Sequence, residues 1–440
     1  MAEISELHFT TQPGGMVQGS VRVPGDKSIS HRSIMLGSLA SGTTTVDGFL
    51  EGEDSLATLA AFRAMGVDIS DPNDGQLSIS GVGIDGLVVP ASPLDLGNSG
   101  TAMRLMAGVL AGQSFASTLS GDESLNSRPM QRVCAPLASM GARIHAQPTG
   151  TPPLRIEPST GLTGIDYQMP VASAQVKSCL LLAGLYASGE TCVSEPAVTR
   201  DHTERMLASF GARVNRSQSR VCVEGGQQLG ATHVSVPGDF SSATFFLVSA
   251  AICPGSDLLI ENVGINPTRI GALEVLRLMG ADIELQNRRQ SGAEPVADLR
   301  VRYRPLQGID VPEALVPLAI DEFPVLLIAA LAADGPTRVT GAEELRVKES
   351  DRIDAMANGL RAVGIDVSET ADGITVYPGP LTGGIVDSRG DHRIAMAFAI
   401  AGLLCESELT VGNCANVNTS FPGFIDVAQE AGLALVSAND

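Results

Sequence analysis

Lysine is almost absent from this sequence. Only Lys27, Lys177 and Lys348 occur among 440 residues, whereas arginine occurs 26 times. Each lysine stands in a short polar cluster, V-P-G-D-K-S-I-S-H-R, S-A-Q-V-K-S or L-R-V-K-E-S-D-R, beside an apolar stretch. Lysine is a compact ammonium with three donors, unlike the planar and always charged arginine. A solvated surface position can explain any one of the three, but all three in such contexts are candidates for chemistry.

Positive charge and aromatic residues are also scarce. The formal net charge is −20, aromatics make up 4% of the chain, and tryptophan is absent. A nucleic-acid surface needs a basic stripe, so no nucleic-acid partner is predicted. The longest apolar runs, such as Val325–Ala333 and Ile394–Cys405, fall short of the roughly 18 residues that span a membrane, so no membrane partner is predicted. An anionic ligand must therefore be held by a local cationic pocket.

The sequence lacks signals for secretion, metals and nucleotide cofactors. The start M-A-E-I-S-E-L has no apolar core, and the seven cysteines form no C-x-x-C, which predicts reduced cysteines in a cytoplasmic protein. The six histidines show no paired metal spacing, so neither a metal nor a cofactor is predicted. Gly81–Gly86 matches G-x-G-x-x-G, but L-V-V-P follows it instead of a helix, which indicates a turn.

A phrase of the form L-x-x-(M/F/V)-G, with some variation, recurs six times at spacings of 68 to 84 residues. It is typical of a helix that ends at a left-handed glycine and is followed by a strand. A fixed period of this kind indicates a repeated supersecondary unit. The six glycines are Gly66, Gly141, Gly211, Gly280, Gly364 and Gly432.

Each repeat also contains a nearly all-apolar stretch, which predicts a helix buried on every side. These stretches are Ser30–Ala40, Thr101–Ala111, Val176–Ala187, Ser242–Ile252, Phe323–Ala332 and Ile394–Leu404. Polar residues stand immediately before them. Helix capping explains the Ser, Asn and Asp residues there, but not Lys27, Gln175, His392 or Arg393. If the six helix N-termini point the same way, their N–H groups and dipoles form an anion-binding surface.

The phrase V-P-G-D occurs at Val23–Asp26 and again at Val236–Asp239, with three repeats between the copies and three after the second. This arrangement predicts an α/β protein of two similar lobes. The first lobe is residues 24–236, and the second is residues 1–23 plus 237–440, with hinge crossovers near Pro24 and Pro237. A ligand is expected between the lobes, where clefts usually form.

Several motifs in order along the chain resemble the enolpyruvyl transferases, specifically the 5-enolpyruvylshikimate-3-phosphate synthase (3-phosphoshikimate 1-carboxyvinyltransferase) family. They are Gly25–Arg32, Leu96–Thr101, Ser127–Met130, Ser173–Lys177, Arg200–Glu204, Asn266–Arg269, Arg346–Arg352 and Asp391–Met396. The S-A-Q-x-K, R-x-H-x-E and N-x-T-R elements look like class II of the family, whose members are often glyphosate tolerant. The resemblance implies a two-lobed fold of six βαβαββ-like units, three per lobe, in agreement with the repeat count.

The resemblance also implies the reaction. The enolpyruvyl group of phosphoenolpyruvate is joined to the 5-hydroxyl of shikimate 3-phosphate through a tetrahedral addition–elimination intermediate, and phosphate is released. The implied shikimate 3-phosphate ligands are Lys27, Ser28, Arg32, Ser173, Ala174, Gln175, Arg200, Asp321 and Lys348. The implied phosphoenolpyruvate ligands are Lys27, Asn98, Gly100, Arg128, Gln175, Arg352 and Arg393. The implied catalytic residues are Asp321, Glu349 and Lys27.

These residue types suit the chemistry. Arginines can clamp carboxylate and phosphate groups with two hydrogen bonds each. Asp321 is the expected base for the hydroxyl proton, and Glu349 its expected proton-transfer partner. Structural alternatives stay open at this point: Asp321 can be a helix cap, and Arg32, Arg200 or Arg352 a surface ion-pair residue. His392 is expected to be structural.

The chain departs from the family pattern in the segment Asn418–Pro422, where some members carry a lysine before T-F-P. Its absence favours glyphosate tolerance, whereas Gly100, which is alanine in some tolerant relatives, favours inhibition. Glyphosate is therefore an expected inhibitor, and a monomer is expected.

Three rival functions remain. The sister transferase acting on UDP-N-acetylglucosamine uses a loop cysteine, and the segment Gly121–Pro129 has none. A non-catalytic phosphosugar-binding protein on the same fold could lose Asp321 and Glu349, but both are present. An RNA-end-processing enzyme is disfavoured by the acidic balance.

Overall fold

The computed structural model describes residues 7–439, which divide into two compact units. Unit 1 comprises Met1–Pro24, Pro237–Gln290 and Pro295–Asp440, and unit 2 comprises Gly25–Val236 with Ser291–Glu294. The predicted absence of a leader at M-A-E-I-S-E-L rests almost wholly on residues 1–6, which lie outside the described part of the chain.

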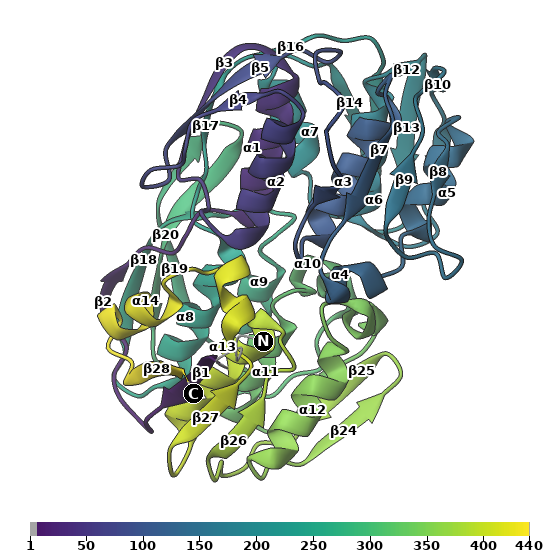
Figure 1. Ribbon diagram of the computed structural model, residues 1–440. Coiled ribbons are helices and arrows are strands. Elements are labelled where there is room, and N and C mark those ends of the chain that lie inside the picture. Colours follow the sequence, from purple (N-terminus) through teal and green to yellow (C-terminus); the bar gives the residue numbers. More distant parts are fainter. Residues whose placement is uncertain (1–6, 440) are drawn as a thin grey trace. The chain divides into compact units, whose positions relative to one another are not determined.

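Unit 2 contains three repeats, each with a buried helix, a more exposed helix and a small sheet. The buried helices are α1 (Lys27–Leu39), α3 (Gly100–Ala111) and α6 (Ala174–Gly184). The more exposed helices are α2 (Glu53–Ala64), α5 (Gln131–Ser139) and α7 (His202–Ser209), and the short α4 (Glu123–Ser127) precedes α5. Helix α1 packs against the strand β5 (Leu77–Val82), and α3 packs against α6 (Figure 1). The core of unit 2 therefore lies around these three helices.

The sheets of unit 2 follow the repeats. The first sheet runs β16 (Leu229–Gly230), β3 (Ala40–Asp47), β5, β4 (Asp68–Ile69), with β17 (His233–Ser235) also paired to β3. The second runs β6 (Leu94–Asp95), β7 (Ser117–Ser120), β9 (Leu154–Ile156), β8 (Ile144–His145). The third runs β11 (Asp166–Gln168), β13 (Glu190–Ser194), β15 (Arg220–Glu224), β14 (Val214–Ser217), and β10 (Leu162–Thr163) pairs with β12 (Ala187–Ser188).

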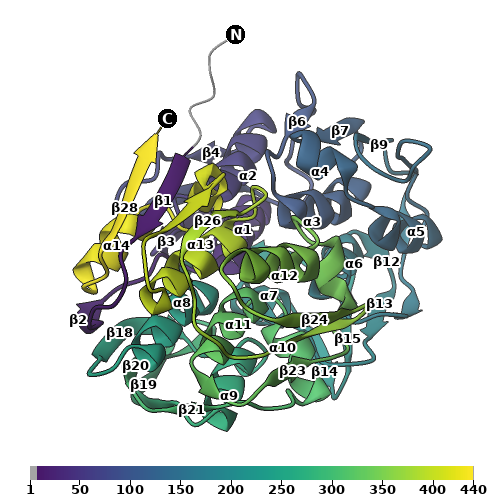
Figure 2. The ribbon, with the colours of Figure 1, turned by 90° about the horizontal axis from the view of Figure 1, so that it is seen from below.

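Unit 1 repeats this plan. Its buried helices are α8 (Phe240–Ile252), α11 (Phe323–Leu331) and α13 (His392–Ala401), and α11 packs against both of the others (Figure 2). Its other helices are α9 (Gly271–Leu278), α10 (Val316–Ala319), α12 (Arg352–Ala362) and α14 (Phe424–Glu430). Short 3-10 helices are η1 (Glu313–Leu315), η2 (Glu343–Val347), η3 (Gly402–Leu404) and η4 (Ala415–Thr419).

The sheets of unit 1 also belong to successive repeats. One runs β19 (Asp282–Ser291), β20 (Glu294–Arg302), β18 (Asp257–Gly264), β2 (Gln18–Val21). Another runs β23 (Thr337–Val339), β25 (Gly373–Val376), β24 (Val367–Thr370), and β21 (Leu306–Gln307) pairs with β22 (Ala333–Asp334). The last runs β26 (Gly384–Asp387), β27 (Leu409–Gly412), β1 (Leu7–Thr11), β28 (Leu435–Asn439).

The predicted repeat signature is confirmed. All six glycines that end the repeated phrase have φ between +87° and +101°, a left-handed conformation that glycine adopts without a steric penalty. Each follows a helix of the more exposed set and precedes a strand. The six apolar stretches all form buried helices, as predicted.

Side-chain caps position most of the buried helices. Asp26, Ser99, Ser173, Asp239 and Asp391 each accept a hydrogen bond from a backbone N–H of the helix that follows. Helix α11 differs, because its N-cap is Glu322, which makes no such bond. The alternative that Asp321 serves as the helix cap is therefore wrong, and its side chain contacts Arg352 and Lys348.

The prediction that all seven cysteines are reduced is wrong for one pair. Cys192 on β13 stands directly opposite Cys222 on β15, and the two form a disulfide. The other five cysteines are free and buried. Sequence spacing did not reveal the pair because the register of two antiparallel strands brings together residues 30 positions apart.

Among residues 7–439, no single helix is both long and apolar enough to cross a membrane. The segments Glu313–Ala319 and Phe323–Leu331 reach that length only together, and they meet at a bend of 119°.

Candidate active site

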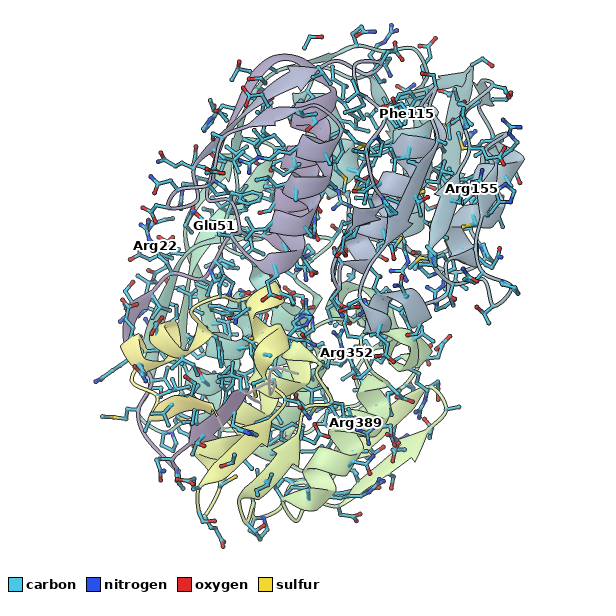
Figure 3. All side chains as sticks on the ribbon, viewed as in Figure 1. Arg22, Glu51, Phe115, Arg155, Arg352 and Arg389 are labelled. Carbon is cyan, nitrogen blue, oxygen red and sulfur yellow. A yellow bond between two sulfur atoms is a disulfide. The ribbon has the colours of Figure 1, made fainter. Side chains whose placement is uncertain are left out.

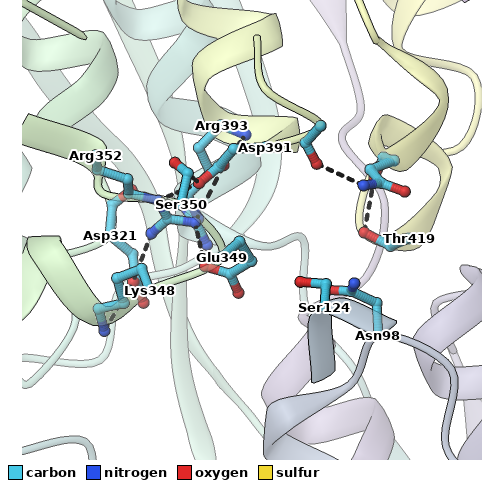
Figure 4. Close-up of polar contacts among 12 residues, drawn as sticks. Asn98, Ser124, Asp321, Lys348, Glu349, Ser350, Arg352, Asp391, Arg393 and Thr419 are labelled. Atoms are coloured by element: carbon cyan, nitrogen blue, oxygen red, sulfur yellow. Dashed lines mark hydrogen bonds and ion pairs between the residues drawn. The ribbon is translucent and has the colours of Figure 1, made fainter. Parts of the chain in front are cut away.

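One group of predicted site residues lies in unit 1 and is organised by Arg352, the first residue of α12 (Figure 3). Its side chain is only 1% exposed. Its Nε donates to Asp391 Oδ2 at 2.8 Å, its Nη2 to Glu349 Oε2 at 2.6 Å, and its Nη1 to Asp321 Oδ1 at 3.3 Å (Figure 4). One buried guanidinium therefore gathers three carboxylates, and two of them are the predicted catalytic residues.

Asp391 is the most deeply buried of these carboxylates. It caps α13 by accepting from the backbone N–H of Arg393 at 2.9 Å, and it also accepts from Ser350 Oγ at 3.1 Å. Burial is the largest single influence on the pKa of Asp391 and would raise it, but the charge and the hydrogen bond of Arg352, together with the interaction with His392, lower it below its ordinary value. Burial also acts to lower the pKa of the Arg352 guanidinium. The three carboxylates together outweigh burial and raise that pKa above the usual range.

Asp321 lies between α10 and α11 and receives cations from two elements. Lys348 Nζ is 3.4 Å from Asp321 Oδ1, and Arg393 Nη1 donates to the Asp321 backbone oxygen at 2.9 Å (Figure 4). Lys348 follows the 3-10 helix η2, and Arg393 is in the first turn of α13. The structure thus brings together all five sequence-predicted site residues of unit 1: Asp321, Lys348, Glu349, Arg352 and Arg393.

A buried layer supports Asp321 from behind. The next residue, Glu322, is fully buried and accepts from Ser241 Oγ; its Oε1 lies 3.5 Å from Arg269 Nη1 and 3.8 Å from Arg393 Nη1. Arg269 also donates to Ser241 Oγ at 2.8 Å. The N-x-T-R motif therefore acts through this layer, holding the backbone on which Asp321 stands.

A second group of predicted site residues lies in unit 2, where Arg32 is buried on α1. Its Nε donates to Thr203 Oγ1 at 2.7 Å, its Nη2 to Ser178 Oγ at 2.8 Å, and its Nη1 to the Ser28 backbone oxygen at 2.9 Å. All three partners are neutral, so the charge of Arg32 is not cancelled by direct contact. Burial lowers the pKa of Arg32 to about 10, and the nearby charge of Arg200 also acts to lower it, whereas Glu204 and Asp26 raise it. Two guanidiniums that repel each other in this way favour an anion between them.

Arg128 and Asn98 form a second polar group in unit 2. Arg128 Nη2 donates to Asn98 Oδ1 at 2.6 Å and to Ser124 Oγ at 3.0 Å, and the Asn98 amide donates to Asp122 at 2.7 Å. Gly100 begins α3 beside them. A Cβ placed on Gly100 would lie 3.3 Å from Arg128 Nη1 and 2.8 Å from Arg104 Nη1. The helix start therefore approaches two arginine head groups more closely than a side chain would allow.

Arg104 contacts Gln175, a predicted site residue, and none of the sequence motifs pointed to it. Its Nη1 donates to Gln175 Oε1 at 2.7 Å, and Gln175 Nε2 donates to Thr101 Oγ1 at 3.0 Å. These bonds join the start of α3 to the start of α6, where Ser173 is the cap and Ala174 the first residue. The missed signal was a single charge inside the otherwise apolar helix Gly100–Ala111, one turn after Gly100.

Lys27 and His31 sit on the same helix but differ in exposure. Lys27 Nζ lies 2.5 Å from Asp54 Oδ2, and its side chain is 20% exposed. His31 is fully buried, with Nδ1 2.8 Å from Thr58 Oγ1 and Nε2 3.3 Å from Ser99 Oγ. Burial, followed by the charges of Lys27 and Arg32, lowers the pKa of His31 well below its ordinary value. Lys27 is thus the reactive candidate, and His31 supports the cap of α3 as a neutral ring.

Among the described residues, one group of acids and thiols is close enough together to hold a metal ion: Glu190, Cys192 and Cys222. Its two sulfurs are joined in the disulfide, and none of the three is a predicted site residue.

Comparisons with known proteins identify the family of this chain. Residues 11–428 match the family model described as EPSP synthase (3-phosphoshikimate 1-carboxyvinyltransferase). The chain is 64% identical over 428 residues to the 3-phosphoshikimate 1-carboxyvinyltransferase of Methylococcus capsulatus, covering 97% of this chain and 98% of that one. The solved EPSP synthase of Acinetobacter baumannii is 52% identical, with a TM-score of 0.88 over 98% of this chain and 100% of that one.

A more distant structure bears on the fold alone. The enolpyruvyl transferase NikO of Streptomyces tendae has a TM-score of 0.80 at 16% identity, covering 99% of this chain and 100% of that chain. The predicted α/β enolpyruvyl-transferase fold is confirmed. With a family model over most of its length and relatives of this similarity, the chain belongs to the EPSP synthase family.

Proposed function

We propose that this protein transfers the enolpyruvyl group of phosphoenolpyruvate to the 5-hydroxyl of shikimate 3-phosphate and releases phosphate. The observation that carries the proposal is the contact of Asp321 and Glu349 with one buried guanidinium, beside Lys348. Two carboxylates and an ammonium within one cluster can move a proton off a hydroxyl and a proton onto a carbon.

The steps follow from these groups. Asp321 accepts the proton of the 5-hydroxyl as its oxygen bonds to C2 of phosphoenolpyruvate, and Glu349 directs a proton to C3, which becomes a methyl group. The tetrahedral intermediate then returns a methyl proton to the carboxylate of Glu349 as the C3–H electrons form the new C2–C3 double bond, and the C2–phosphate oxygen bond breaks to release phosphate. Lys27 stands near the oxygen that leaves.

The anions are assigned to the cations of both units. Shikimate 3-phosphate is held by Lys27, Ser28, Arg32, Ser173, Ala174, Gln175, Arg200, Asp321 and Lys348. Phosphoenolpyruvate is held by Lys27, Asn98, Gly100, Arg128, Gln175, Arg352 and Arg393. Arg104 is added to this second set because it bonds Gln175 and lies against Gly100.

The rival reaction on UDP-N-acetylglucosamine is not favoured. The cysteine that follows the S-R-P-M motif, Cys134, is buried in α5, and burial raises the pKa of its thiol to about 11. A buried thiol of that pKa is a poor nucleophile at neutral pH.

The finer assignments belong to the same proposal. The class II motifs and the missing lysine before Phe421 support a partly glyphosate-tolerant enzyme, and Gly100 supports binding of glyphosate as an inhibitor. The lobes hinge near Pro24 and Pro237. The cytoplasmic location and the monomeric state stay predictions.

The test is phosphate release from phosphoenolpyruvate by the full-length protein. Release is expected with shikimate 3-phosphate and not with UDP-N-acetylglucosamine or with either anion alone. Turnover with the sugar nucleotide, or tight binding of shikimate 3-phosphate without any phosphate release, would contradict the proposal.

A further inference from the structure

Lys177 is the one of the three lysines that the proposed reaction does not use. Its side chain is 2% exposed, compared with 20% for Lys27 and 21% for Lys348. Its Nζ lies 2.9 Å from Glu204 Oε1, 3.1 Å from Glu195 Oε1 and 3.3 Å from the Thr199 backbone oxygen. An ammonium has three donors, and these three acceptors use all of them.

The three acceptors belong to the segment that carries Arg200. Glu195 follows the last residue of β13, Thr199 immediately precedes Arg200, and Glu204 is in α7. Glu195 Oε2 also accepts from Thr199 Oγ1 at 2.6 Å, so the loop between β13 and α7 is closed on itself. A single buried ammonium therefore holds both ends of this loop and the residue next to Arg200.

Lys177 itself belongs to the other side of the proposed phosphate site. It lies one turn into α6, whose N-terminal residues Ser173, Ala174 and Gln175 are assigned to shikimate 3-phosphate. The next residue, Ser178, bonds Thr203 Oγ1 at 2.8 Å, and Arg32 donates to both hydroxyls. Adjacent residues of α6 thus bond adjacent residues of α7, which fixes the distance between the helix start and the Arg200 loop.

The chemistry requires a lysine at this position. The acceptors surround a point, which suits a compact ammonium, whereas an arginine fork needs its acceptors in one plane. The second oxygen of Glu204 is buried with no hydrogen-bond partner, so the ammonium is the principal compensation for this carboxylate. Removing the ammonium would leave buried carboxylates that repel each other and would open the loop.

We propose that Lys177 is a positioning residue that sets the affinity for the phosphate of shikimate 3-phosphate by fixing the loop that carries Arg200 to α6. This inference rests on the proposed function. Lys177 acts through Arg200 and makes no contact with the substrate.

The experiment is a double-mutant cycle on the full-length protein, with the dissociation constant of shikimate 3-phosphate measured by calorimetry. Lys177→Met is expected to raise that constant about 10-fold, and Thr199→Val, which removes only the hydroxyl bond to Glu195, about 3-fold. In an Arg200→Gln background, neither change should raise it further by more than roughly twofold, because the group being positioned is gone. The KM of phosphoenolpyruvate should stay within roughly twofold in all variants.

Two comparisons separate positioning from a general loss of structure. Arg220→Gln, which removes an exposed ion pair with Asp166 on the same sheet, should leave the constant unchanged. Thr199→Val keeps the shape and both buried charges of the loop, so it tests the inference even if Lys177→Met fails to fold. Shikimate, which lacks the phosphate, should bind wild type and Thr199→Val equally.

The inference would be overturned if Lys177→Met or Thr199→Val weakened shikimate 3-phosphate binding as much in the Arg200→Gln background as in wild type. It would also be overturned if these variants lowered the melting temperature but left that binding unchanged. An Arg200→Gln variant that binds shikimate 3-phosphate as tightly as wild type would overturn it as well. Failure of the proposed function itself is distinct, because wild type would then release no phosphate and bind no shikimate 3-phosphate.

Discussion

Arg352 in unit 1 and Arg32 in unit 2 are both buried, and both donate from all three guanidinium nitrogens. The nitrogens of Arg352 meet Asp391, Glu349 and Asp321, whereas those of Arg32 meet two hydroxyls and a backbone oxygen. Burial is the largest influence on both guanidiniums and acts to lower the pKa of each. The pKa of Arg352 is nevertheless raised by its three carboxylates, whereas that of Arg32 falls to about 10. The same residue type therefore serves two purposes.

The difference shows what each arginine can do within its own unit. In unit 1 the guanidinium of Arg352 organises carboxylates, which can carry protons, so this cluster is suited to the chemical steps. In unit 2 the guanidinium of Arg32 bonds only neutral partners and is within electrostatic reach of Arg200, so this group of residues is suited to holding an anion. A protein with a net charge of −20 needs such local cationic regions to bind anionic substrates.

The largest expected effect is loss of turnover from the carboxylates of unit 1. Asp321→Asn and Glu349→Gln keep the shape of each side chain but remove a proton carrier, and turnover should fall about 10²–10⁴-fold. Binding of shikimate 3-phosphate should change far less. Initial rates of phosphate release together with calorimetry measure both quantities.

Asp354→Asn is the matched control for these two variants. Asp354 is in the same unit and pairs with Arg389 at the surface, outside the cluster. It should keep near-wild-type turnover. If Asp321→Asn or Glu349→Gln also does so, the task assigned to unit 1 is wrong.

The next expected effect is on the free energy of unfolding. It compares a charged partner of Arg352 with a neutral partner of Arg32. Asp391→Asn removes a buried charge from Arg352 and should lower the free energy of unfolding by about 3–5 kcal/mol. Thr203→Val removes a neutral acceptor from Arg32 and should cost about 1–3 kcal/mol. Chemical denaturation of both variants gives the two values. Equal losses would show that the identity of the partner does not matter at these sites.

The six repeated units could be predicted from the sequence, because each unit has its own glycine signature and apolar stretch. The left-handed glycines and the apolar helices depend on local chain chemistry, so Gly66 and its five counterparts predicted six units. The motif residues Asp321, Lys348, Glu349, Arg352 and Arg393 lie in one cluster, and their roles in binding and catalysis stay predictions. Arg104 and the disulfide were missed, since each depends on which distant residue lies opposite. The hydrogen-bond partners of Arg32 and Arg352 could not be predicted either, because a sequence motif identifies the arginine but not the distant residues that it contacts.

A smaller effect is expected at Gly100, which bears on the anion-holding task of unit 2. A methyl group there would meet Arg104 Nη1 at 2.8 Å and Arg128 Nη1 at 3.3 Å, so both head groups must shift. Gly100→Ala should weaken glyphosate, the longer anion, more than phosphoenolpyruvate. The ratio of the glyphosate inhibition constant to the phosphoenolpyruvate KM should rise. A ratio equal to that of wild type would show that Gly100 does not line this pocket.

The smallest expected effect is a dependence of unit 2 on pH. Burial and the charges of Lys27 and Arg32 hold the pKa of His31 well below its unfolded value of about 6.5. Above that pH the ring is neutral in both states, and the full stability is present. As the pH falls below it, the unfolded chain takes up a proton that the folded chain does not, so stability is lost. The carboxylate of Asp391 in unit 1, whose pKa is also lowered, begins to cost stability only below about pH 3.9.

Mild acid should therefore weaken unit 2 through His31 before it weakens unit 1 through Asp391. The measurement is the free energy of unfolding at pH 7.5 and 5.5 for wild type and His31→Gln, whose amide can still bond Thr58 and Ser99. Wild type should lose more stability between the two pH values than the variant, and Asp391→Asn should lose as much as wild type. An equal loss of unfolding free energy in wild type and His31→Gln would mean that the buried ring does not set the acid sensitivity of unit 2.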